Sequence, residues 1–211
     1  MRASMLLVAL SILGCTKSYY RTMEAFGKEK RDILASRVEG ARDAQEDTKE
    51  QFQSTLERFS ALVGFEGGEL EDVYRQLDSS YQRSEQRAEE VRDRVNAVEN
   101  VAEDLFEEWE KELGLYESQD LRRRSEEQLV RTRGRYRDLI QAMRRAEGKM
   151  DPVLRAFRDQ VLFLKHNLNA RAIASLEGTV DSLESEVAAL IREMDASIRE
   201  ANEFVQSIEA G

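Results

Sequence analysis

Apolar residues recur every three or four positions over long stretches of the chain, with charged residues between them. This spacing puts the apolar side chains on one face of an α-helix, and a heptad pattern kept up over about five repeats is typical of coiled-coil packing. The clearest row comprises Leu70, Val73, Leu77, Tyr81, Ser84, Ala88, Val91, Val95, Val98, Ala102, Leu105 and Trp109. The pattern therefore predicts a long amphipathic helix over this stretch.

Residues that would interrupt a helix fall at three places, which are residues 64–68, 114–118 and 148–152. Gly just past a helix end and Pro just inside a helix start are common arrangements, and Asp is a good N-cap residue. Asp151 followed by Pro152 therefore predicts a helix start, and Ser118 predicts another. We expect four helices, over residues 18–63, 69–113, 119–147 and 152–208.

The composition agrees with an all-α fold. Charged residues make up 35% of the 211 residues, and the chain holds a single Pro, whereas an all-β chain needs many turn residues. Helices of ten or more turns are about 65–85 Å long and are too long for a compact globule of this size. The sequence therefore predicts an elongated antiparallel bundle of four helices with coiled-coil packing.

Charge is distributed unevenly along the chain, whose formal net charge is -10. Residues 69–115 hold 15 acidic and 6 basic side chains, and residues 118–150 hold 5 acidic and 10 basic side chains. If the chain turns back at 114–118, the acidic stretch 99–112 faces the basic stretch 122–133. We expect this intramolecular pairing to explain the run Arg122–Arg124. Binding of anionic lipid or another anionic ligand through the basic third helix is the alternative, and the acidic balance disfavours nucleic acid.

The first fifteen residues have the features of an export signal. Arg2 is followed by an apolar run that ends at Leu13 and is shorter than the roughly 20 residues of a spanning helix. The sequence Ile12-Leu13-Gly14-Cys15 resembles the lipobox of bacterial lipoprotein precursors. The resemblance implies that residues 1–14 are removed as a signal peptide. It also implies that Cys15 receives a diacylglycerol and that the new amino end is acylated by a fatty acid such as palmitate.

Lipidation would fix the location of the protein. Each buried methylene contributes about 0.8 kcal/mol, so three acyl chains on one cysteine would hold the chain at a membrane. In lipoproteins of Gram-negative bacteria an Asp after the Cys resembles a retention signal for the inner membrane, and Thr16 stands there instead. We therefore expect residues 15–211 to form a single domain that faces the periplasm from the outer membrane.

The residues needed for common catalytic chemistry are missing from the sequence. The chain has one His and one Cys, and it has no glycine-rich loop followed by Lys-Ser or Lys-Thr. A di-iron helical bundle needs Glu three residues before a His, and Phe163 stands three residues before His166. We therefore predict no enzymatic activity, no cofactor and no metal site.

Residues 161–173 are unusual because an apolar start is followed by polar and basic residues. Two Asn residues inside a helix lower its intrinsic propensity, and a buried polar layer can set the register of a coiled coil. The alternative is a contact surface for another protein of the cell envelope. Its candidate residues are Lys165, His166, Asn167, Asn169 and Arg171.

Residues 27–34, then Val38, Ala41, Arg42 and Asp43, and the run 164–173 are similar to a bacterial domain-of-unknown-function family of small helical envelope proteins. The resemblance covers most of the chain and brings no activity, ligand or catalytic residue. We expect a lipid-anchored spacer or adaptor that binds another envelope component, with a second copy of the chain as a further candidate partner.

Overall fold

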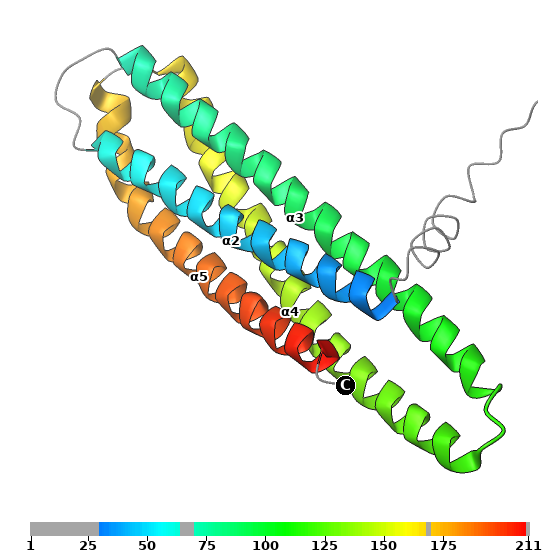
Figure 1. The fold of residues 1–211 in the computed structure, drawn as a ribbon. Coiled ribbons are helices and arrows are strands. Elements are labelled where there is room, and N and C mark those ends of the chain that lie inside the picture. The colour runs from blue at the N-terminus through cyan, green and yellow to red at the C-terminus, as the bar shows by residue number, and fades with distance from the viewer. Residues whose placement is uncertain (1–29, 64–69, 168–169, 210–211) are drawn as a thin grey trace, which may run out of the picture.

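The structure is a computed structural model that describes residues 30–63, 70–167 and 170–209. Over these ranges it contains α2 (Lys30–Val63), α3 (Leu70–Leu113), α4 (Gln119–His166) and α5 (Ala170–Glu209). Each helix packs against the next one in the chain, and α5 also packs against α2, which closes the ring. Consecutive helices run in opposite directions and form an elongated bundle (Figure 1). The predicted all-α antiparallel bundle is confirmed for the described residues.

The core is built from the predicted heptad rows. In α3, nine of the twelve predicted positions are buried, from Leu77 to Leu105, and the other three are partly buried against the same core. Three phenylalanines lie at the centre of the bundle. Phe59 and Phe52 of α2 lie 5.0 and 6.1 Å from Phe157 of α4, measured between ring centroids. The bundle is therefore held by one continuous apolar core.

The predicted boundary between the second and third helices is confirmed. Helix α3 ends at Leu113, and the amide of Leu115 donates to the carbonyl of Glu112 at 2.9 Å. Ser118 caps α4, since its side chain accepts a hydrogen bond from the amide of Leu121 at 3.4 Å. Ser at this position satisfies a backbone amide that has no partner within the helix.

The predicted break at residues 148–152 is wrong, because α4 runs without interruption from Gln119 to His166. Asp151 and Pro152 are interior residues of this helix. Proline inside a helix costs about 3 kcal/mol. The apolar row continues across it, with Met150, Val153 and Phe157 all buried, and each such side chain contributes about 1.5–3 kcal/mol. Burial on both sides of Pro152 therefore outweighs its cost.

The chain breaks instead where one long helix was predicted over 152–208. Helix α4 ends at His166, and α5 begins at Ala170. Asn167 caps α4, since its backbone amide donates to the carbonyl of Leu164 at 3.1 Å and its side-chain amide donates to the carbonyl of Phe163 at 2.9 Å. Asn can bond the nearby backbone and so competes with a continuing helix. It therefore ends a helix here, and the predicted register-setting layer at Asn167 is wrong.

The ion pairs show which parts of the helices lie at the same level. At the start of α2, the ammonium group of Lys30 lies 2.6 Å from the carboxylate of Glu108 on α3. Further along, Lys49 lies 3.1 Å from Asp195 on α5. The start of α2 and the end of α3 therefore lie at the same end of the bundle. The part of the first predicted helix before Lys30 lies outside the described residues.

The predicted pairing of α3 with α4 is correct in its direction and only partly correct in its register. Arg133 lies 2.6 Å from Glu110, and Trp109 donates to Ser125 at 2.8 Å, so the later part of the acidic stretch 99–112 faces 122–133 as predicted. Glu99 binds Arg144 instead, which lies further along α4 than the predicted stretch. Because the two helices are antiparallel, the start of α4 lies at the same end of the bundle as the end of α3 and extends beyond it (Figure 1), and residues 119–124 are all exposed. Arg123 and Arg124 pair with Asp120 of their own helix, at 2.5 and 3.0 Å.

Candidate functional site

The proposed lipidation site lies outside the described residues. Cys15, Thr16 and the signal segment 1–14 all precede Lys30, where the described part of the chain begins. The lipobox therefore stays a prediction from the sequence. No helix in the described ranges is long and apolar enough to cross a membrane.

The predicted contact residues are only partly brought together. Lys165 and His166 are exposed in the last turn of α4. The side chain of Asn167 is engaged in capping that helix. Asn169 and the side chain of Arg171 lie outside the described part of the structure. Two of the five predicted residues therefore stand on the described surface with their side chains available.

Two exposed apolar residues next to this pair were not predicted as surface residues. Leu162 is 45% exposed and Phe163 is 41% exposed. Residues three or four positions apart in a helix share a face, so Leu162 lies beside Lys165 and His166. We call Leu162, Phe163, Lys165 and His166 the distal patch. In the sequence, Leu162 and Phe163 directly follow Val161, which is buried. Three consecutive apolar residues cannot all lie on one face of a helix, and this was the signal in the sequence that some of them are exposed.

The opposite end of the bundle carries a second exposed apolar group. Leu115 is 79% exposed, Tyr116 39% and Leu121 54%, and Val130 follows on α4 at 66%. We call residues 114–126 the hairpin tip, which comprises the loop after α3 and the first two turns of α4. Every residue from 114 to 124 is exposed. In the sequence, Leu115 and Tyr116 directly follow the turn residue Gly114, and this was a signal of exposed apolar residues that the heptad pattern does not include.

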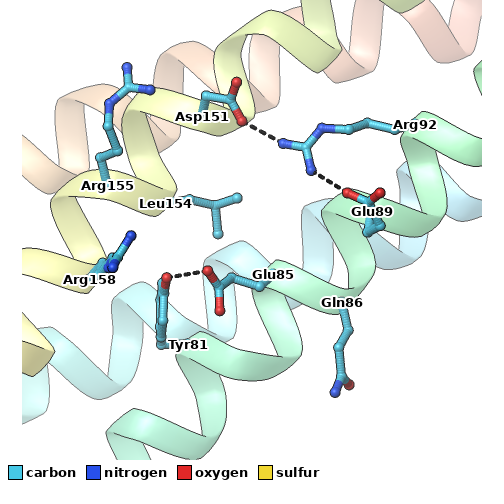
Figure 2. A pocket seen from close by; sticks show the side chains of 9 residues that line it. All are labelled: Tyr81, Glu85, Gln86, Glu89, Arg92, Asp151, Leu154, Arg155 and Arg158. Atoms are coloured by element: carbon cyan, nitrogen blue, oxygen red, sulfur yellow. Dashed lines mark hydrogen bonds and ion pairs between the residues drawn. The ribbon is translucent and has the colours of Figure 1, made fainter.

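A groove of about 440 Å³ lies between α3 and α4, away from both ends (Figure 2). Arg92 of α3 crosses it, with its guanidinium 2.8 Å from Glu89 and 2.5 Å from Asp151 of α4. Burial penalises the charged form of Arg92, and the hydrogen bonds and charges of Glu89 and Asp151 outweigh that penalty and raise its pKa. The predicted N-cap residue Asp151 is therefore used to join two helices.

The acidic and basic side chains of the whole groove occur in equal numbers. The hydroxyl of Tyr81 donates to Glu85, and burial followed by this carboxylate raises the pKa of Tyr81. Arg155 and Arg158 line the same groove and are exposed (Figure 2). The groove therefore holds three arginines against three carboxylates, and it presents no net charge to a ligand.

The described residues offer little for catalysis in this groove. Its lining contains no Ser, Cys or His, and two of its three carboxylates are bound by Arg92 while the third accepts from Tyr81. Across the described ranges, no three metal-ligating side chains come close enough to hold an ion. A second groove, of about 430 Å³, lies between α4 and α5 beside Phe204 and is lined mainly by polar side chains.

Comparison with known proteins places the chain in one family. Residues 19–208 match the family model described as "Protein of unknown function (DUF2959)", and the chain belongs to that family. No curated protein matches it, and no solved structure matches it. The expected membership in a helical family of unknown function is therefore confirmed.

Proposed function

We propose that this member of the DUF2959 family is a lipid-anchored spacer or adaptor of the bacterial cell envelope. One observation carries the proposal. In the described part of the chain, the large apolar side chains that are exposed lie towards the two ends of the bundle and not along its flanks. Isolated exposed apolar residues are ordinary on a protein surface, but a grouping at specific places marks contact sites. A rod with a contact site at each end is suited to joining two components.

The dimensions of the bundle support this role. Helices α3 and α4 contain 44 and 48 residues, which correspond to about 66 and 72 Å at 1.5 Å per residue. Ion pairs between helices, such as Lys30 with Glu108, Lys49 with Asp195 and Arg92 with Asp151, lie in the half of the bundle that carries the hairpin tip and in its middle. An anchor at Cys15 would hold the end where α2 begins, and the distal patch would then face away from that membrane.

The proposed partner contact is the distal patch. Phe163 and Leu162 supply apolar area, and aromatic residues are enriched at protein interfaces. Lys165 and His166 add positive charge or hydrogen-bond donors beside them. These features favour a protein partner that presents an apolar surface edged by carboxylates.

Site-specific photocrosslinking tests this contact in the full-length protein in its native membrane. A photoreactive residue replaces Phe163, and control variants carry it at Gln53 on α2 or Asn100 on α3, which are exposed flank positions. We expect a discrete protein adduct from position 163 and none from either flank. Adducts from the flanks alone, or none from any position, would contradict an end-on adaptor.

The lipid anchor has its own test. We expect Cys15→Ala to abolish incorporation of a labelled fatty acid and to release the protein from sedimented membranes, because the thiol is the proposed acceptor of the lipid. Ser11→Ala, which alters the signal segment but not the thiol, serves as the control and should leave the label unchanged. Unchanged labelling of the Cys15→Ala chain would refute the anchor.

Anionic-lipid binding through the basic third helix is the second candidate, and the ion pairs weaken it. Six of the ten basic residues in 118–150 have a carboxylate within 4.0 Å. The six residues are Arg123, Arg124, Arg131, Arg133, Arg144 and Arg145. Paired charges of this kind leave less net attraction for an anionic surface. Binding to anionic vesicles that weakens strongly with added salt would favour this candidate.

A further inference from the structure

The hairpin tip contains the longest run of exposed residues in the described chain, from 114 to 124, and three residues of this run are large and apolar. Its first two residues after Gly114 are Leu115 and Tyr116, and Leu121 follows in the first turn of α4. None of the three belongs to the core. Tyr carries an apolar ring and a polar hydroxyl, a combination that is enriched at the boundary between membrane and water.

The charges of the tip cancel. Residues 114–126 contain three acidic and three basic side chains. Asp120 accepts both Arg123 and Arg124, while Glu117, Arg122 and Glu126 are exposed. A surface of this kind has little long-range attraction for an anionic bilayer, so the contact it favours is short-ranged and apolar. Long arginine side chains beside apolar groups can reach the headgroup region.

The position of the tip relative to the proposed anchor decides which surface it meets. Lys30 begins α2 beside Glu108 of α3, and Arg31 lies over the ring of Trp109 at 5.9 Å. The chain therefore enters the bundle at the end that carries the tip. The tip extends beyond this entry point, away from the rest of the bundle (Figure 1).

The opposite orientation is disfavoured by chain length. Fourteen residues lie between Cys15 and Lys30, and the fifteen residue steps between the two span at most about 50 Å when the chain is fully extended. Helix α2 alone, with 34 residues, carries the distal end about 50 Å from Lys30. A bundle standing on its distal end would thus require a completely stretched linker, whereas one standing on its tip would not.

We propose that the hairpin tip rests in the surface of the same bilayer that holds the lipid on Cys15, with Leu115, Tyr116 and Leu121 among the headgroups and upper acyl chains. This inference rests on the proposed lipid anchor. The two contacts together hold the bundle upright, so that the distal patch faces away from the membrane. The lipid by itself would fix the position of the chain at the membrane but not the direction of the bundle.

A fluorescent label at the tip tests the proposal in the full-length lipidated protein. Cys15 is the only cysteine of the chain, and its thiol is consumed by the lipid, so Leu115→Cys introduces one free thiol for an environment-sensitive dye. Leu162→Cys is the matched control, an exposed leucine in the distal patch. Both proteins are reconstituted into vesicles of phosphatidylethanolamine with a minor share of phosphatidylglycerol, with and without brominated acyl chains.

We expect the dye at position 115 to emit at shorter wavelength and to be quenched severalfold by the brominated lipid, at low and at high salt alike. The dye at position 162 should show neither effect. Quenching at both positions would mean that the bundle lies flat, and quenching at neither would mean that the tip is not at the bilayer. Either result overturns the proposal.

Two further arms separate this proposal from its rivals. Flotation of the vesicles reports the lipid anchor itself, so loss of flotation is a failure of the anchor, while flotation without quenching is a failure of the tip contact. A blue-shifted dye at position 115 in native membranes but not in lipid vesicles would indicate a protein partner. A blue shift in plain buffer, in the Cys15→Ala chain, would indicate that the chain itself covers the tip. Both results would also overturn the proposal.

Discussion

Phe59 of α2 stacks on Phe157 of α4 across the diagonal of the bundle, with ring centroids 5.0 Å apart and ring planes within 8° of parallel. Both side chains are buried, with 1% and 0% of their surface exposed. Phe157 lies five residues beyond Pro152 in the same uninterrupted helix. The stack thus links the centre of the core to the feature that the sequence analysis interpreted as a helix boundary.

Truncating this ring should therefore damage the whole fold. We expect Phe157→Ala to lower the free energy of unfolding by about 3–5 kcal/mol, because a large buried aromatic side chain is lost and a cavity remains. Chemical denaturation of the full-length protein, followed by circular dichroism, measures the loss. Phe163→Ala removes the same group from an exposed site and should change stability by no more than about 0.5 kcal/mol. Equal effects of the two changes would show that Phe157 does not lie in the core.

Pro152 should be a weak point within α4. It has no amide hydrogen to donate to the carbonyl four residues earlier, at Gly148. We expect Pro152→Ala to raise the free energy of unfolding by about 1–3 kcal/mol, since the restored hydrogen bond outweighs the added freedom of the unfolded chain. Thermal unfolding measures this change. A lower melting temperature would mean that α4 ends near the proline, as the sequence pattern had indicated.

Gly148→Ala is a second substitution that should stabilise α4. Nothing lies within 4 Å of where its new Cβ would stand. Alanine should therefore add about 0.5–1 kcal/mol through helix propensity alone.

The helical core could be predicted from the sequence because apolar residues spaced three and four positions apart share one face of a helix, and that face is the one that a bundle buries. The row from Leu77 to Leu105 alternates in steps of three and four, and the helix buries it without exception. The break between the last two helices depended on weaker signals. Asp151 and Pro152 are typical of a helix start, but Met150 and Val153 continue the apolar face and decide the outcome. At this point the burial of apolar side chains determined the structure, and the local preference of Asp151 and Pro152 for a helix start did not.

The candidate contact surfaces were predicted less completely, for a related reason. Lys165 and His166 stood out by residue type. Leu115 and Leu121 could not be recognised as surface residues in this way, because their exposure depends on how far α4 extends past α3. That offset comes from the register of pairs such as Arg133 with Glu110, which periodicity within one helix cannot supply.

Gln45 offers a test of polar burial within the core. Its side chain is fully buried, and in the described structure neither its amide nitrogen nor its amide oxygen has a hydrogen-bond partner. A buried polar group without a partner costs about 1–3 kcal/mol. We therefore expect Gln45→Met, which keeps the length of the side chain, to raise the free energy of unfolding by a similar amount in denaturant titrations.

The matched control for Gln45 is Thr55, another buried polar residue of α2. Its hydroxyl has partners, at 2.9 Å from the hydroxyl of Ser84 and 3.3 Å from the carbonyl of Ser80. Thr55→Val should lower stability by about 0.5–1.5 kcal/mol, because these hydrogen bonds are lost. If Gln45→Met were destabilising as well, the amide of Gln45 would have a partner such as bound water.

The partly buried phenol of Tyr136 should make the stability of the fold depend on pH in the alkaline range. Its ring packs edge-on against Phe106 and Phe204, with centroids 5.4 and 6.4 Å away. Burial raises its pKa to about 12, the charges of Glu99 and Glu103 act in the same direction, and Arg144 opposes them. The folded protein thus holds the phenolic proton more tightly than the unfolded chain does, where the pKa is about 10.

The direction of the pH effect follows from this difference. Below pH 10 the phenol is neutral in both states, so its contribution to stability is fully present. Between about pH 10 and pH 12 the unfolded chain loses the proton first, and stability falls with rising pH. Tyr136→Phe removes this proton and should reduce the fall over that range. Melting temperatures recorded from pH 9 to pH 12 measure the difference, and identical slopes for the parent and Tyr136→Phe would show that this phenol is not held neutral by the core.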